Sequence, residues 1–209
     1  MAPVIFSFGW VTFYSYGFAI ACGVMIAQFF VSRDVRVRPF WYLQDSLFVV
    51  LSLGALIGGR LFYWFSNYGF SFNSQLIAFW DGGFSIVGSL AGGCLGGWLF
   101  ARWYCVDCLA LFDAIALYAP LVQAVARIGC WCAGCCYGVS TDLPWRVLSI
   151  DGEWVHPTQI YSALALLIVF GLVYSRIFDG SVAGVRAGVY LIGAGAERFV
   201  IDFLRQERS

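Results

Sequence analysis

The sequence has no lysine and few charged residues of any kind. Only 11% of its 209 residues carry a charge, whereas about a quarter do in soluble domains. This excludes an extensive water-exposed surface, on which lysine is the usual cation. The formal net charge of zero also argues against nucleic acid as a partner.

Nothing at the N-terminus has the pattern of a cleaved signal. Residues 1–10 contain no basic residue, and a secretory signal begins with a basic segment. We therefore expect the first apolar run to stay in the protein as a membrane span. Because 61% of the chain is hydrophobic, we expect an integral membrane protein.

Six apolar stretches are long enough to cross a membrane, which takes about 20 residues per helix. We predict an all-α fold: a polytopic helix bundle that forms one membrane domain over residues 1–209, with one substantial outer loop at 129–157. The 24 glycines are expected to let neighbouring helices approach closely. The predicted transmembrane helices cover about 10–31, 42–65, 84–103, 109–128, 158–176 and 187–204.

The placement of the twelve arginines predicts the orientation of the chain. Half of them lie in or beside the short loops of one side, which the positive-inside rule assigns to the cytoplasm. The N-terminus and the loop 129–157 are then expected outside. The cytoplasmic set is Arg33, Arg36, Arg38, Arg102, Arg176 and Arg186.

Three other arginines, Arg60, Arg127 and Arg198, lie within apolar helices near their outer ends. A charge at membrane depth costs at least a few kcal/mol and is kept mainly where it is paired or functional. Each arginine alone could extend its guanidinium to the lipid headgroups. Three at one depth favour a shared binding site for an anion.

A charged stripe is predicted near the C-terminus. Arg198, Asp202 and Arg205 are spaced i, i+4 and i+7, so they would share one helix face. Such a face could bind phosphate, with the carboxylate orienting the guanidinium groups. It could equally be an ion-pair ladder that neutralises itself.

Four of the eight cysteines fall within seven residues, at Cys130, Cys132, Cys135 and Cys136. On the outer, oxidising side they are expected to form disulfides, whose pairing a sequence does not give. The spacing of Cys132 and Cys135 also matches a redox or zinc half-site. Four sulfurs in seven residues would crowd a tetrahedral zinc ion, so we expect no metal. A structural disulfide and a thiol-handling redox site both stay open.

Five motifs together resemble the prolipoprotein diacylglyceryl transferase family, and they occur in the family's order over most of the chain, from Tyr16 to Arg205. Each motif alone is weakly specific, whereas five in order are a strong signal. They are Arg60-Leu61-Phe62-Tyr63; Trp80-Asp81-Gly82-Gly83-Phe84-Ser85; Arg127-Ile128-Gly129 through Tyr137-Gly138 and Thr141-Asp142-Leu143-Pro144-Trp145; His156-Pro157-Thr158-Gln159-Ile160-Tyr161; and the terminal helix with Arg198-Phe199.

The resemblance implies a multi-pass enzyme of the bacterial inner membrane, with phosphatidylglycerol and a prolipoprotein as substrates and no cofactor. Such an enzyme moves diacylglyceryl from the phospholipid to the acceptor cysteine thiol and releases glycerol phosphate. The implied catalytic residues are Arg127 and Arg198, as phosphate clamps, and His156, as a base unless it only caps a helix. The implied substrate-binding residues are Tyr16, Arg60, Gly138, Gln159, Tyr161, Asp202 and Arg205.

The chain departs from the family at four places. Val87 stands where the family has a histidine, cysteines replace the family's Asn and Glu residues after Arg127, and Ser162 replaces an acid. The chain also stops at Ser209 before a further span, from which we expect six spans and an outer C-terminus. These departures leave a second hypothesis open, a diverged member that acts as a membrane thiol–disulfide oxidoreductase or a lipid-binding protein.

Overall fold

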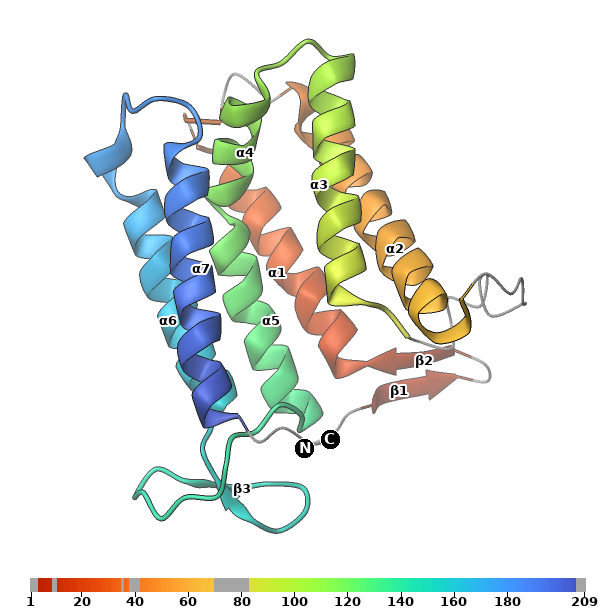
Figure 1. Ribbon diagram of the computed structural model, residues 1–209, viewed down its shortest axis with the longest axis vertical. Helices are drawn as coiled ribbons and strands as arrows, with labels where there is room; N and C mark the ends of the chain where they lie inside the picture. Colours follow the sequence, from red (N-terminus) through yellow and green to blue (C-terminus); the bar gives the residue numbers. More distant parts are fainter. Residues whose placement is uncertain (1–3, 9–10, 35, 38–41, 70–82, 206–209) are drawn as a thin grey trace. The chain divides into compact units, whose positions relative to one another are not determined.

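Helices make up nearly all of the regular structure, as the sequence predicts (Figure 1). The computed structural model describes residues 4–8, 11–34, 36–37, 42–69 and 83–205, and side chains only from residue 17 onward. Arg38, Arg208 and residues 80–82 of the second motif lie outside the described residues. The chain divides into two compact units, the first of Met1–Asp34 with Asp113–Ser209 and the second of Val35–Phe112.

Each predicted span corresponds to helix over most of its length. The helices are α1 (Ser15–Val31), α2 (Gln44–Tyr68), α3 (Ile86–Trp103), α4 (Cys108–Ala116), α5 (Ala119–Ala133), α6 (Thr158–Tyr174), the short 3-10 helix η4 (Arg176–Phe178) and α7 (Val185–Leu204). The strands form two hairpins, of β1 (Val4–Phe8) with β2 (Val11–Tyr14) and of β3 (Val147–Leu148) with β4 (Trp154–Val155).

The first predicted span, 10–31, is wrong at its start. Residues 11–14 pair antiparallel with β1, and α1 begins only at Ser15. The cause is local, because β-branched and aromatic residues such as those at positions 11–14 prefer a strand to a helix.

The fourth predicted span, 109–128, is broken in two and extended. Helix α4 ends at Ala116, and α5 begins again at Ala119, because Pro120 in its first turn cannot continue a preceding helix. Helix α5 then runs to Ala133, so the loop predicted from residue 129 begins at Gly134. Two of the clustered cysteines, at 130 and 132, therefore lie on a helix.

The second unit is built on two helices that touch through their glycines. Helix α2 packs along α3, and Gly54 and Gly58 of α2 face Gly88 and Gly92 of α3. A Cβ atom added at Gly54 would lie 2.6 Å from the carbonyl oxygen of Gly92, which no side chain tolerates. The predicted close approach of glycine-rich helices is confirmed for this pair.

In the first unit, helices pack as neighbours in the order α1, α5, α6 and α7. Leu166 and Val173 of α6 are buried in this interior. A carboxylate from α4 caps the start of α7: the backbone N–H groups of Gly184 and Ala187 donate to Asp113 at 2.8 and 2.7 Å. A negative charge at a helix N-terminus also complements the helix dipole.

Of the described helices, only α2 is by itself long and apolar enough to cross a membrane. The bent pair α4 and α5 meets the same criterion when it is counted as one span, and α1 and α6 are apolar but shorter. The number of helices that cross a membrane therefore stays a prediction.

Replacing Gly92 with alanine should destabilise the pair of α2 and α3. The new Cβ atom would collide with the backbone of Gly54 and Gly58, and overpacking of this kind costs roughly 1–3 kcal/mol. We expect a lower melting temperature for the purified Gly92→Ala variant. Gly93→Ala is the matched control, because nothing lies within 4 Å of its added Cβ atom. Equal melting temperatures for the two variants would contradict this packing.

Candidate functional site

The end of α5 turns sharply and brings three cysteines together. Gly134 ends the helix in a left-handed conformation, with φ 70° and ψ 34°, and Cys136 follows with φ 65°. The reversed backbone lets the N–H of Cys135 donate to the carbonyl of Cys130 at 3.1 Å. Glycine adopts this conformation freely, whereas another residue does so at a cost of roughly 1–3 kcal/mol. Other contacts must therefore hold Cys136 in place.

Those contacts come from the first turn of α6. The Thr158 hydroxyl donates to the carbonyl of Cys136 at 2.6 Å, and the Gln159 amide donates to the carbonyl of Cys135 at 2.5 Å. Both α6 residues are only 2% exposed. Gln159, predicted to bind substrate, is thus seen to hold the loop, and its Oε1 atom is buried with no hydrogen-bond partner among the described residues.

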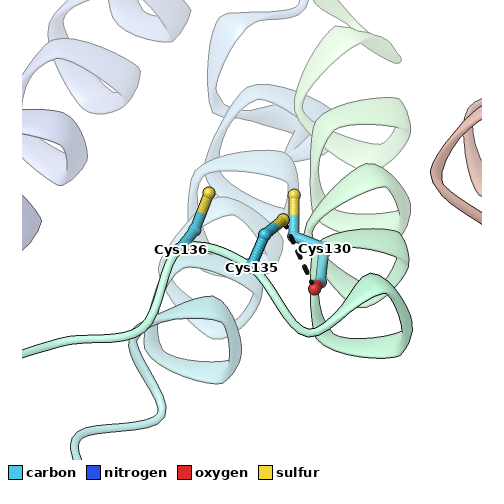
Figure 2. A group of neighbouring side chains, drawn as sticks. All are labelled: Cys130, Cys135 and Cys136. Carbon is cyan, nitrogen blue, oxygen red and sulfur yellow. Dashed lines mark hydrogen bonds between the residues drawn. The ribbon is translucent and has the colours of Figure 1, made fainter. Parts of the chain in front are cut away.

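Figure 2 shows the thiol cluster, formed by Cys130, Cys135 and Cys136. The three sulfur atoms lie within 4.8 Å of one another. Cys130 is buried, whereas Cys132 is exposed and does not belong to the cluster. All eight cysteines are free thiols in the structure, so the predicted disulfide stays a prediction.

Cys136 lies next to positive charge. The Arg205 guanidinium donates through Nη2 to the Cys136 sulfur at 3.2 Å. Hydrogen bonds with the thiols of Cys130 and Cys135 hold the pKa of Cys136 well below its usual range, and the charges of Arg205 and Arg127 act in the same direction. The thiol hydrogen bonds and the two arginines therefore favour the deprotonated form of Cys136.

Arg205 does not share a helix face with Arg198 and Asp202, so that prediction is wrong for Arg205. Helix α7 ends at Leu204, and the extended backbone of Arg205 forms an antiparallel bridge with Gly138. The Arg205 side chain thereby reaches the cysteine loop. Arg198 and Asp202 do form the predicted ion pair, at 3.1 Å, with both side chains about half exposed.

Arg127 lies on α5, one turn before the thiol cluster, and is half-buried. Its charge lowers the pKa of Cys136. Within the described part of the chain, no group accepts a hydrogen bond from the Arg127 guanidinium. Its donors are therefore available to an anionic ligand.

Gly138 is the point where three segments meet. Its N–H donates to the carbonyl of His156 at 3.0 Å, and the N–H of Val139 donates to the carbonyl of Leu204 at 2.9 Å. A Cβ atom added at Gly138 would lie 2.7 Å from the Cβ of His156 and 2.8 Å from Cγ2 of Thr158. The close approach seen at Gly138 is thus to the protein's own backbone and side chains.

His156 does not cap α6, because the N-cap is Pro157 and no side chain in the described structure makes a capping hydrogen bond there. The imidazole lies beside Tyr161, with 3.4 Å between Nδ1 and the Tyr161 hydroxyl oxygen. Trp145 donates its indole N–H to the same hydroxyl at 2.6 Å. The Tyr161 hydroxyl thus lies between the indole of Trp145 and the imidazole of His156 and orients the imidazole.

Of two further predicted residues, one belongs to the second unit and the other lies outside the described side chains. Arg60 belongs to the second unit and is 2% exposed. Its Nη1 donates to the carbonyl of Gly83 at 3.0 Å, and its guanidinium carbon lies 5.8 Å from the ring centres of Tyr63 and Phe84. Arg60 thereby fixes the segment that leads into α3. Tyr16 lies in the first turn of α1, but its side chain is outside the described residues.

One buried acid belongs to this region although the motifs do not mark it. Glu197 of α7 accepts a hydrogen bond from Ser162 of α6, and both side chains are buried. Ser162 stands where the resemblance places an acid, so α7 supplies a carboxylate next to that position. The signal for Glu197 is its place inside an apolar helix, where an acid is rare and usually functional.

The ends of α5 and α7 and the start of α6 meet the loop that carries β3 at one end of the first unit (Figure 1). This end joins apolar helices to two arginines, Arg127 and Arg205, and to the Cys136 thiol. Guanidinium donors in an apolar setting bind a phosphate or carboxylate strongly. The arrangement can therefore hold an anionic headgroup at the end of a helix bundle.

Comparison with known proteins agrees with this chemistry. The chain matches the family described as prolipoprotein diacylglyceryl transferase over residues 3–209. It belongs to this family. Relatives named phosphatidylglycerol–prolipoprotein diacylglyceryl transferase include the proteins of Clostridium tetani, 33% identical over 98% of this chain and 86% of the relative; Bartonella bacilliformis, 31% identical over 97% and 78%; and Parasynechococcus marenigrum, 34% identical over 97% and 80%.

Within the prolipoprotein diacylglyceryl transferase family, these relatives carry the name of the transferase activity. None of the three is named as a thiol–disulfide oxidoreductase or a lipid-binding protein, so nothing favours the second hypothesis. Val87, which stands where the resemblance implies a histidine, lies exposed in the first turn of α3.

Replacing Thr158 with valine should loosen the cysteine loop. The variant keeps the shape of the side chain but leaves the carbonyl of Cys136 without its donor, which costs about 1–3 kcal/mol for a buried group. We expect faster hydrogen exchange at residues 135–138, measured by mass spectrometry.

Thr141→Val is the matched control for this prediction, because the Thr141 hydroxyl makes only a long contact of 3.4 Å with the N–H of Leu143. Exchange at residues 135–138 that is the same in both variants would show that Thr158 does not hold the loop.

Proposed function

We propose that this protein transfers the diacylglyceryl group of phosphatidylglycerol to the cysteine thiol of a prolipoprotein. Relatives that align with nearly the whole chain are named for this activity. The observation that carries the proposal is the pair Arg127 and Arg205. The positive charges of both arginines act on the Cys136 thiol near the end of an apolar helix. An anionic headgroup is the ligand that such a pair favours.

The proposed reaction forms one carbon–sulfur bond and breaks one carbon–oxygen bond. The acceptor thiolate, its proton already lost to water, attacks the diacylglycerol carbon that bears the phosphate ester. The electron pair of the broken bond leaves with glycerol phosphate. Because the leaving group carries negative charge through the transition state, fixed guanidinium donors stabilise it, each by roughly 3–4 kcal/mol in an apolar site.

We assign Arg127 and Arg198 as the phosphate clamps and Arg205 as a third donor. Arg127 has donors available, and Asp202 orients the guanidinium of Arg198. Arg205 contacts the Cys136 sulfur, and a phosphate oxygen is a better acceptor than sulfur. A bound headgroup would therefore draw Arg205 toward the phosphate.

His156 is assigned as a polar contact of the bound headgroup. Tyr161 orients its imidazole, with 3.4 Å between Nδ1 and the hydroxyl oxygen, and the role as a base stays a prediction. Gly138 and Gln159 act by holding the loop. The headgroup contacts predicted for Tyr16 and Arg60 stay predictions.

The proposal includes a multi-pass topology in the bacterial inner membrane, with six spans in one membrane domain and the N-terminus outside. Large apolar side chains that are more than half exposed support it. In water such surface costs about 25 cal/mol per Å² of apolar area, whereas lipid removes this cost. On α1 and α7 these exposed apolar side chains are Phe18, Met25, Phe29, Leu191, Ile192, Phe199, Val200 and Phe203.

Replacing Arg127 with alanine should abolish rescue of a bacterial strain depleted of its own diacylglyceryl transferase. Loss of one donor to the developing phosphate charge lowers the rate by about 10²–10³-fold. Arg146→Ala is the control, because Arg146 is paired with an exposed carboxylate, that of Asp142. Growth of the Arg127→Ala strain at the wild-type rate, at equal protein level, would contradict the assignment.

A further inference from the structure

We propose that the thiol cluster binds a thiophilic divalent cation such as Zn²⁺ through the sulfur atoms of Cys130, Cys135 and Cys136, with one coordination position left open. The site is additional to the transferase activity and does not depend on it. Four sulfurs from residues 130–136 would be too crowded, but the structure brings together only three and leaves Cys132 out.

The distances between the sulfur atoms fit such an ion. Zinc binds thiolate sulfur at about 2.3 Å, so two sulfurs on one tetrahedral zinc ion lie about 3.8 Å apart. The sulfurs of the cluster lie within 4.8 Å of one another, so each pair has to close by no more than about 1 Å. Rotation of the cysteine side chains supplies a change of this size.

The backbone that carries the three ligands is already held in place. Cys130 lies in the last turns of α5, and Gln159 and Thr158 hold the carbonyls of Cys135 and Cys136. Metal binding would therefore order few additional groups, which favours affinity.

The charges around the thiol cluster are also compatible with a bound divalent cation. Three thiolates and one divalent cation leave a single negative charge, which the Arg205 guanidinium on the Cys136 sulfur balances. Gln159, whose amide holds Cys135, has a buried Oε1 atom with no partner in the described structure.

The test uses the full-length protein in detergent, reduced with a phosphine so that no added thiol competes for the metal. Cd²⁺ is the probe, because cadmium–thiolate bonds absorb in the ultraviolet by charge transfer. We expect this absorbance to saturate at one Cd²⁺ per chain. Alkylation of the unmodified sequence, read by mass spectrometry, should then show protection of the two accessible cluster cysteines, Cys135 and Cys136, and unchanged labelling of Cys132.

Two variants test which cysteines bind the metal. Cys136→Ser should lower the affinity for Cd²⁺ by at least about tenfold, since changes to the outer partners of metal ligands alone cost 10–100-fold. Cys132→Ser should leave the affinity unchanged. Absence of the charge-transfer band at one equivalent of Cd²⁺ would overturn the proposal. Alkylation that still labels Cys135 or Cys136, or protection that covers Cys132 equally, would overturn it too. This result is read on the unmodified sequence and does not depend on how a variant folds.

Discussion

The two hydrogen bonds from the first turn of α6 to the carbonyls of Cys135 and Cys136 hold the candidate site together. They fix a loop that would otherwise relax from the left-handed conformation of Cys136. With the loop fixed, Gly138 pairs with Arg205, and the arginine side chain reaches the Cys136 sulfur. The arginines, the Cys136 thiol and the ends of three helices are therefore coupled through one junction.

The helices are predictable from the sequence because apolar length is a direct signal of a helix in a membrane protein. The stretch 42–65 corresponds to α2 at Gln44–Tyr68, and 84–103 to α3 at Ile86–Trp103. The hairpin of β1 and β2 depends on pairing between two short segments, which the apolar pattern of one segment does not reveal. Pro120 is a signal of the break before α5. The uninterrupted apolar run around it, however, predicts one continuous helix.

The parts of the candidate site are predictable, but their arrangement is not. Arg127, Gly138 and Arg205 stand out by motif and by charge in an apolar sequence. Helical spacing predicts that α7 includes Arg205 and that Arg205 shares a helix face with Arg198 and Asp202. In the structure α7 ends one residue earlier, at Leu204. The convergence of three cysteines, with Cys132 left out, follows from two left-handed residues and from contacts with α6, and no local pattern encodes long-range contacts of this kind.

We have proposed that guanidinium groups at one end of the first unit bind an anionic phospholipid while a cysteine thiol is alkylated. The most direct measurement combines the purified protein, a peptide with a lipobox cysteine and a defined phospholipid, and reads the peptide mass. We expect a diacylglyceryl thioether on the cysteine, with release of glycerol phosphate, from phosphatidylglycerol and not from zwitterionic phosphatidylcholine. No thioether from phosphatidylglycerol, or an equal yield from both lipids, would contradict it.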